Sequence, residues 1–387
     1  VVRLGQEEKK YFIKTQAEWA KDAMRVLGFA YKPLTGTDWE VMDAQELESG
    51  LILAGICGMI DPPRPGAARS VKRCISAGIL PVMITGDHPL TAVAIAGEIG
   101  ISKGIGVING HEIDSMSDAE LYRRVVKDRV LARVSPQHKY RIVNLLKSNG
   151  QVVAMTGDGV NDAPAIKSAD IGIAMGISGT QVTKEASSMV LTDDDFSTIV
   201  EAVHEGRAIY DNIRKFIRYL LGGNIGEVLV MLLTSIMGMP LPMLPIQILW
   251  VNLVTDGLPA MALGIEPPEP GIMNRAPRSK NESIFARGLG WTILGRGTYI
   301  AVISIATFLI GFMTAAAQGA DNLAQARTMA FTTLVFAQLF YVFECRSERF
   351  SPFELGFFKN KFLILAVLTS VIMQISALYL PLLQNIF

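Results

Sequence analysis

The sequence is poor in cysteine and histidine and has no excess of charge of either sign. Its three cysteines lie far apart without a Cys-X-X-Cys spacing, so neither a disulfide framework nor a zinc site is indicated. Thirty-six Lys and Arg balance thirty-six Asp and Glu, and a chain without a basic field is a poor partner for nucleic acid. Half of the 387 residues are hydrophobic, which excludes a disordered protein.

Long apolar runs are confined to the part of the chain after Arg218. Most of them approach the roughly 20 residues that a helix needs to cross a bilayer. Buried core helices are the alternative, but uncharged runs of this length seldom recur in soluble proteins. We predict five membrane spans, at about 219–238, 244–265, 291–313, 329–343 and 362–380, of which the fourth is short.

The loops between these spans differ in charge. Residues 264–290 and 345–361 each carry four Lys or Arg, whereas 239–242 and 314–326 carry none. Short basic loops collect on the cytoplasmic side. The soluble half precedes the first span, so we expect a multi-pass membrane protein whose soluble half is cytoplasmic.

The soluble half alternates short apolar runs with helical patterns. Such runs are typical of a parallel sheet covered by helices on both faces, and parallel sheets place their chemistry past the carboxyl ends of their strands. The predicted strands are Leu51–Met59, Leu80–Ile84, Val130–Val134, Val152–Met155, Ile171–Ala174 and Met189–Leu191.

Two of these runs end in glycine-containing turns with carboxylates. Thr85-Gly86-Asp87 opens a helix, where free backbone amides suit a phosphate; an ordinary strand-to-helix turn with a capping Asp is the alternative.

The second turn is Thr156-Gly157-Asp158-Gly159-Val160-Asn161-Asp162. Asp158, with Asp162 as a second ligand, offers hard oxygens to Mg²⁺. The fold itself does not require two carboxylates at the end of one strand, which favours the functional interpretation. Lys139, on the first turn of the helix that starts at Pro136, could neutralise a phosphoryl group or be a solvated surface lysine.

Ionisable residues also lie inside the predicted spans, where charge is costly and marks function. Asn224 and Glu227 share one face of the first span, and Asn252, Thr255 and Asp256 share one face of the second. Polar residues that only bridge helices are the alternative. Carboxylate, amide and hydroxyl oxygens suit a hard cation such as calcium.

These motifs together resemble the P-type cation-transporting ATPases, whose phosphorylation domain has a haloacid-dehalogenase-like fold. Thr156–Asp162 is similar to the family's magnesium signature, Thr85-Gly86-Asp87 and Lys139 to its other phosphate-site motifs, and Asp61-Pro62-Pro63-Arg64 to its interdomain hinge. Arg25 looks like the arginine that contacts the ATP phosphates, and the resemblance implies that Arg64 of the hinge also belongs to the cofactor-binding residues. The resemblance implies a Rossmann-type α/β cytoplasmic domain, an all-α transmembrane bundle, and ATP and Mg²⁺ as cofactors.

Several family motifs are missing. The chain has no Asp-Lys-Thr-Gly-Thr, whose Asp forms the phosphoenzyme, because Thr35-Gly36-Thr37 lacks both Asp and Lys. Thr-Gly-Glu of the actuator domain and Pro-Glu-Gly-Leu of the fourth membrane helix are also absent, as is a tenth membrane helix. We therefore expect a C-terminal portion of a pump, with the actuator domain, most of the nucleotide domain and four membrane helices as its partners.

The resemblance divides the chain into four parts. They are the end of the nucleotide domain (1–50), the phosphorylation domain (51–195), a stalk helix (196–218) and the transmembrane domain (219–387). A proline-free stretch from Phe196 to Gly238 could form one helix that couples the phosphate domain to Glu227. Asp193-Asp194-Asp195 before it is expected to cap this helix.

The membrane motifs are most similar to the calcium-pump subgroup. By that resemblance Asn224, Glu227, Thr255 and Asp256 form one calcium site, and Asn252 with Asp256 the other. Gln338 stands where two-site pumps carry glutamate, which leaves open one or two ions per cycle. The expected function is ATP-driven calcium transport in a lipid bilayer. A pump for manganese, sodium or potassium, or a regulatory protein without a nucleophile, is the alternative.

Overall fold

The computed structural model describes residues 4–22, 24–34, 42–60, 62–102, 106–318 and 322–384. Asp61 and the segment Thr35–Thr37 lie outside the described residues. The chain forms two compact units, Val1–Ala202 with Met273–Lys280, and Val203–Ile272 with Asn281–Phe387. The division into four parts stays a prediction.

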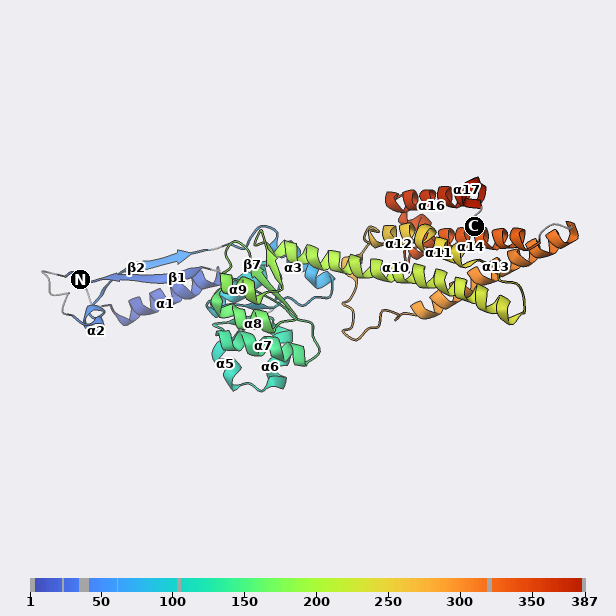
Figure 1. Ribbon diagram of the computed structural model, residues 1–387. Helices are drawn as coiled ribbons and strands as arrows, with labels where there is room; N and C mark the ends of the chain where they lie inside the picture. The colour runs from blue at the N-terminus through green and yellow to red at the C-terminus, as the bar shows by residue number, and fades with distance from the viewer. Residues whose placement is uncertain are drawn as a thin grey trace. The chain divides into compact units, whose positions relative to one another are not determined.

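An antiparallel strand pair follows the first helix. Helix α1 (Gln6–Lys21) precedes β1 (Arg25–Tyr31), and β1 pairs with β2 (Ile52–Met59), with α2 (Ala44–Leu47) between the strands (Figure 1). The apolar run 51–59 is therefore a strand, but the prediction that it belongs to the parallel sheet is wrong. A short apolar run does not show whether its partner strand is parallel or antiparallel. Here the partner is the antiparallel strand β1.

The rest of the first unit contains two three-stranded parallel sheets, which confirms the predicted fold class. One has the order β3 (Met83–Ile84), β5 (Val130–Ala132), β4 (Ile108–Asn109), and the other the order β6 (Ala154–Gly157), β7 (Ile171–Met175), β8 (Met189–Leu191). Strand β5 is buried throughout, as a central strand between helical layers must be. The sequence did not predict β4, which has only two residues.

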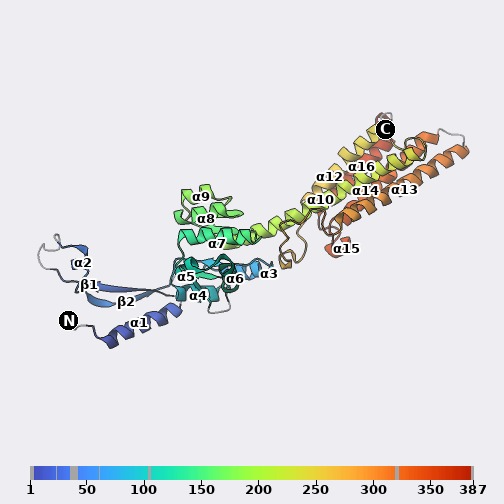
Figure 2. The same ribbon diagram turned by 90° about the horizontal axis from the view of Figure 1, so that it is seen from below.

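Seven helices connect or cover these strands. They are α3 (Ala67–Ser76), α4 (Pro89–Glu98), α5 (Gly110–Ser115), α6 (Asp118–Asp128), α7 (Pro136–Ser148), α8 (Ala163–Ser168) and α9 (Gln181–Ala186). Helix α8 packs against both α7 and α9 (Figure 2), and α6 packs against α7. Leu131 of β5 packs with Leu121 of α6 and Ile142 of α7 in one buried cluster, which fixes these two helices against the sheet.

The second unit is helical. Its long elements are α10 (Phe196–Ile236, which begins in the first unit), α13 (Leu289–Gln318), α14 (Asn322–Cys345) and α16 (Lys361–Tyr379). A further, interrupted helix consists of α11 (Pro245–Trp250), a π-helical turn (Val251–Thr255) and α12 (Gly257–Gly264). Helices α15 (Pro352–Leu355) and α17 (Pro381–Gln384) are short.

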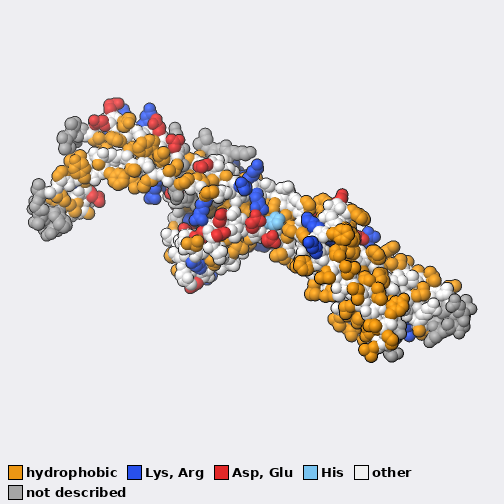
Figure 3. All heavy atoms as spheres, turned by 90° about the horizontal axis from the view of Figure 1, so that it is seen from above, with side chains coloured by type: hydrophobic (Ala, Val, Ile, Leu, Met, Phe, Trp, Pro, Cys, Tyr) orange, Lys and Arg blue, Asp and Glu red, His pale blue; other side chains and the backbone are white. Residues whose placement is uncertain are grey.

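Within the described residues, five of these helical segments are long and apolar enough to cross a membrane. Figure 3 shows hydrophobic side chains over most of the visible surface of this unit. The fourth segment is longer than predicted, because α14 starts at Asn322 whereas its apolar run starts only after Arg327. Arg327 donates to the backbone oxygen of Leu241 at 2.9 Å, so the polar first turns of α14 belong to the helix.

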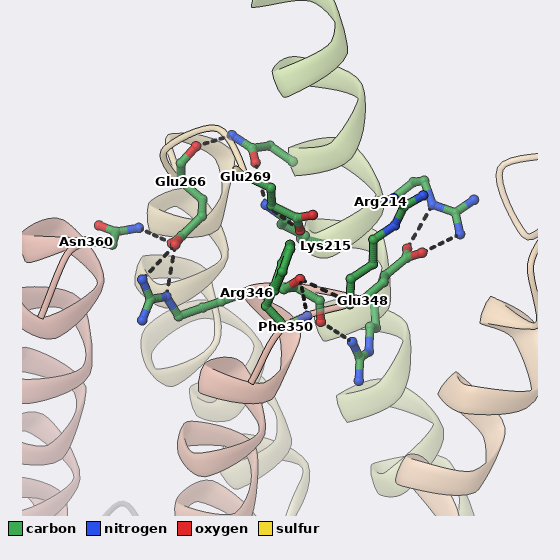
Figure 4. A network of polar contacts seen from close by, with 12 residues as sticks. Arg214, Lys215, Glu266, Glu269, Arg346, Glu348, Phe350 and Asn360 are labelled. Atoms are coloured by element: carbon green, nitrogen blue, oxygen red, sulfur yellow. Dashed lines mark hydrogen bonds and ion pairs between the residues drawn. The ribbon is translucent and has the colours of Figure 1, made fainter. Parts of the chain in front are cut away.

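A buried ionic cluster joins four segments of this unit. The fully buried Arg346 donates to Glu266 Oε1 at 2.9 and 2.8 Å, and Asn360 donates to Glu266 Oε2 at 2.6 Å (Figure 4). Flanking ion pairs are Arg214–Glu348 and Lys215–Glu269. Buried charges persist only when they are paired, so this cluster fixes α10, the end of α12, the end of α14 and the start of α16 to one another.

Candidate functional site

The predicted phosphate-site residues Lys139 and Asp162 are in direct contact. Lys139 Nζ lies 2.5 Å from Asp162 Oδ1, and both side chains are largely buried. Ser135 and His138 form a reciprocal cap at the start of α7, which places Lys139 on the first turn of the helix. A Cβ on Gly157 would lie 2.6 Å from Asp162 Cβ, so the glycine leaves room for this carboxylate. The structure thus disfavours the reading of Lys139 as a solvated surface residue.

Asp158 differs from Asp162 in its exposure. Its backbone oxygen accepts hydrogen bonds from the N–H of Thr180 at 2.9 Å and from the Oγ1 of Thr183 at 3.1 Å. Its exposed carboxylate takes no hydrogen bond or ion pair from the described residues. Asn161 is exposed on the same turn. A fixed backbone with an open carboxylate fits Mg²⁺, which is usually held by one or two carboxylates plus waters and substrate oxygens.

The Thr85-Gly86-Asp87 turn closes on itself. Thr85 Oγ1 donates to Asp87 Oδ2 at 2.9 Å and accepts from the N–H of Asp87 at 3.1 Å. The side chain of His88, not Asp87, accepts from the first turn of α4. Asp87 is therefore not the helix cap that the ordinary-turn alternative requires.

This turn lies beside the end of strand β5. The N–H of Val134 donates to Thr85 O and that of Arg133 to Asp87 O, both at 3.2 Å. Because β5 leads directly into α7, the turn and the start of the Lys139 helix share one edge of the sheet. No direct contact joins Asp87 to Asp158 among the described residues.

Neither predicted arginine forms a hydrogen bond with these turns among the described residues. Arg25 is exposed at the first position of β1, in register with Met59. Arg64 donates from Nη1 to the backbone oxygen of Asp194 at 2.7 Å. The prediction that either arginine contacts a phosphate stays untested.

Asp194 has a role that the sequence did not indicate. Its carboxylate accepts from the N–H groups of Gly176, Ile177 and Ser178 at 2.6, 3.0 and 2.7 Å. These bonds hold the pKa of the Asp194 carboxyl well below its ordinary value, at about 2, and the bond from the N–H of Ile177 has the largest effect. Its neighbours Asp193 and Asp195 bond the first turn of α10 as expected, but the prediction that Asp194 caps α10 is wrong. From the sequence alone, a run of three acidic residues does not show which carboxylate bonds the helix and which bonds another loop.

Four of the predicted ion ligands meet between α10, the interrupted helix and α14, namely Glu227, Asn252, Asp256 and Gln338. Among the described residues, no hydrogen bond joins the side chain of Asn224 or Thr255 to them. Glu227, which is 5% exposed, accepts at Oε1 from Gln338 Nε2 at 2.9 Å and at Oε2 from Asn252 Nδ2 at 2.8 Å. Asp256, 1% exposed, accepts at Oδ1 from the hydroxyl of Tyr219 at 2.9 Å. Sequence reasoning missed Tyr219, because a tyrosine at the end of an apolar span carries no signal of its partner.

Three oxygens at this place lack a donor. Asn224 Oδ1, Asp256 Oδ2 and Gln338 Oε1 are buried without a hydrogen-bond partner in the described part of the chain. A Cβ on Gly223 would lie 2.9 Å from Gln338 Nε2 and 3.2 Å from Asp256 Oδ2, so these groups gather around a point that only glycine leaves open. Buried oxygens without donors are costly unless a cation supplies the missing charge.

The glycines near Glu227 do not break their helix. Helix α10 continues through Gly222, Gly223 and Gly226, and a Cβ on Gly222 would meet the ring of Tyr341 at 2.6 Å. These glycines allow close packing, whereas the irregular backbone lies in the π-helical turn before Asp256. Thr255 is buried, and its hydroxyl donates to Val251 O at 3.0 Å. No group of three or more His, Cys, Asp or Glu forms a metal cluster among the described residues.

Comparisons with known proteins agree with this geometry. A family model described as haloacid dehalogenase-like hydrolase matches residues 8–170, and one described as cation transporting ATPase, C-terminus, matches residues 240–387. A calcium-transporting ATPase of Bacillus subtilis (strain 168) is 52% identical over 369 residues, which are 95% of this chain and 41% of the relative. The chain belongs to the P-type cation-transporting ATPases.

Other members of this family match over nearly the whole chain. Calcium-transporting ATPase 1 of Bacillus cereus (strain ATCC 10987 / NRS 248) is 44% identical over 99% of this chain and 44% of its own length. Calcium-transporting ATPase 1 of Saccharomyces cerevisiae (strain ATCC 204508 / S288c) is 39% identical over 100% of the chain and 40% of its own. The chain spans about two fifths of these relatives. With its five apolar helices, this P-type ATPase chain is a multi-pass membrane protein.

Proposed function

We propose that the protein transports calcium across a membrane with energy from ATP, through an aspartyl phosphate. The observation that carries this proposal is the set of buried oxygens around Glu227 and Asp256. Two carboxylates and three donor-free oxygens inside an apolar helical unit match a hard, weakly hydrated cation. The names of the relatives, which are calcium-transporting ATPases, support the choice of ion.

The exposed edge of the α/β unit would serve the phosphoryl transfer. Asp158 would hold Mg²⁺ together with substrate oxygens, and Lys139 would face the transferred group with Asp162 fixing its ammonium. Bound Mg²⁺ would neutralise charge on the phosphoryl oxygens. The Thr85–Asp87 turn would offer to the same group those backbone amides that its internal hydrogen bonds leave unused. The sequence lacks Asp-Lys-Thr-Gly-Thr, so the nucleophile would come from a further segment of the intact pump.

Charge at the membrane site supports one calcium ion per cycle. Glu227 and Asp256 together supply two negative charges, which balance one Ca²⁺. Gln338 contributes an amide to Glu227 rather than a third carboxylate. A second divalent ion would leave buried positive charge without compensation.

The proposal also assigns the orientation of the protein in the membrane and the role of the long helix α10. The soluble unit would lie on the cytoplasmic side, with the basic loops 264–290 and 345–361. Helix α10 carries Glu227 and runs unbroken from Phe196, so it would transmit movement from the phosphate edge to the ion ligands.

Phosphoenzyme formation from labelled ATP tests the function. The full-length protein would be incubated with calcium, manganese, sodium, potassium or a chelator. We expect labelling that requires calcium and is removed by hydroxylamine, which cleaves acyl phosphates. Labelling triggered by another ion would move the substrate assignment, and none with any ion would overturn the proposal and favour a regulatory protein.

A further inference from the structure

The interrupted helix leaves one backbone carbonyl without its usual donor. In the π-helical turn, the N–H of Asp256 bonds Val251 O, five residues back, at 2.9 Å. Pro259 follows and has no N–H, so the carbonyl of Thr255, four residues earlier, loses its helical partner. At membrane depth a backbone oxygen without a donor costs several kcal/mol, so a neighbouring helix must satisfy it.

That neighbour is α16. The hydroxyl of Ser370, which is fully buried, donates to Thr255 O at 3.3 Å. The hydroxyl of Ser376, which lies in the same helix but is less buried, instead bonds Ile372 O of its own helix at 2.8 Å. Ser370 is thus used between helices, at the carbonyl that Pro259 sets free.

Gln374, which lies four residues after Ser370 in α16, contacts the other end of the π-helical segment. Its Oε1 accepts from the indole Nε1 of Trp250 at 3.1 Å, directly before the π-helical residues. Gln374 is fully buried, and its Nε2 has no hydrogen-bond partner in the described ranges. Ser370 and Gln374 are four residues apart and so share one helix face. This face holds the irregular turn at its first and last residues.

We propose that Ser370 and Gln374 of α16 are positioning residues for ion transport. They contact none of the three donor-free oxygens, but they fix the turn that presents Thr255 and Asp256. If the Thr255 carbonyl loses its donor, the turn can rewind or shift, and both ligands move with it. This inference rests on the proposed calcium transport and adds a fourth helical segment, α16, to the site.

The test uses the full-length pump and two matched variants, Ser370→Ala and Ser376→Ala. Each removes one hydroxyl from the same helix, but only the first leaves a carbonyl of the interrupted helix without a donor. We expect Ser370→Ala to raise the calcium concentration for half-maximal phosphorylation about tenfold, the size typical of lost outer-sphere support. The maximal phosphoenzyme per folded protein should stay unchanged, and Ser376→Ala should match the wild type.

A double substitution tests the second contact. Gln374→Leu and Trp250→Phe should each raise the half-maximal calcium concentration, and the double variant should be no worse than the more impaired single variant, because both remove the same hydrogen bond. Full additivity would overturn the role of this bond.

The outcomes separate this inference from the proposed function. If the wild type shows no calcium-dependent phosphorylation, the proposed function fails. If the wild type responds to calcium and Ser370→Ala behaves like Ser376→Ala, only the positioning role fails. A lower maximal level at an unchanged half-maximal concentration would mean that Ser370 is merely structural, which also overturns the inference.

Discussion

The two polar regions of this protein hold their carboxylates in position in opposite ways. At the edge of the α/β unit, Asp158 is exposed and only its backbone is fixed, by Thr180 and Thr183. In the helical unit, Glu227 and Asp256 are buried and their carboxylates are fixed by side chains of neighbouring helices. Water can solvate a loop carboxylate, but in an apolar bundle each oxygen needs a partner or an ion.

The largest expected effect separates the two regions by function. In the full-length pump, Asp256→Asn should raise the calcium concentration needed for phosphorylation by more than about a hundredfold, because it removes a direct ligand. Asp158→Asn should instead impair phosphorylation at every calcium concentration. Binding of labelled calcium should survive in Asp158→Asn and be lost in Asp256→Asn. Calcium-dependent turnover at the wild-type level in Asp256→Asn would refute the ion-site assignment.

The second prediction concerns the buried cluster of the helical unit. Arg346→Leu leaves Glu266 buried without its cation, which should lower the free energy of unfolding by about 3–5 kcal/mol. Unfolding by a denaturing detergent, followed by circular dichroism, measures this change. Arg349→Leu makes the same substitution at an exposed arginine nearby and should change stability little. Equal losses in both variants would show that the buried pair has no special role.

The third prediction adds one methyl group to the ion site. Gly223→Ala places a carbon about 3 Å from Gln338 and Asp256, which should cost about 1–3 kcal/mol and so raise the half-maximal calcium concentration about 5- to 150-fold. Gly206→Ala, on the same helix, meets no atom within 4 Å and should leave calcium dependence unchanged. If the two variants behave alike, close packing at Gly223 does not shape the site.

The smallest expected effect lies in the α/β unit and depends on pH. The folded-state pKa of Asp194 is about 2, below its ordinary value of 3.8, so ionised Asp194 stabilises the fold fully above about pH 4. This contribution is lost as the pH falls from about 4 to 2. The melting temperature of Asp194→Asn should therefore lie below that of the wild type at pH 7, and the difference should shrink by pH 3. A constant difference would assign the effect to packing.

Local chemistry determined much of this protein from its sequence. The five apolar segments, the parallel α/β class and the polar face formed by Glu227, Asn252 and Asp256 depend on hydrophobic length, periodicity and the cost of charge in an apolar run. These properties are short-range, so a single sequence reveals them. The same reasoning placed Asp158, Asp162 and Lys139 at strand and helix ends.

Only the tertiary structure decided which groups meet. The antiparallel partner of β2, the three amides on Asp194, and the contacts of Tyr219 with Asp256 and of Ser370 with Thr255 all join residues distant in sequence. The glycines near Glu227 allow close helix packing, which the sequence cannot show, because their role depends on the side chains that lie opposite them. A pattern shows that a side chain needs a partner, but the partner is fixed by how the whole chain satisfies its buried polar groups at once.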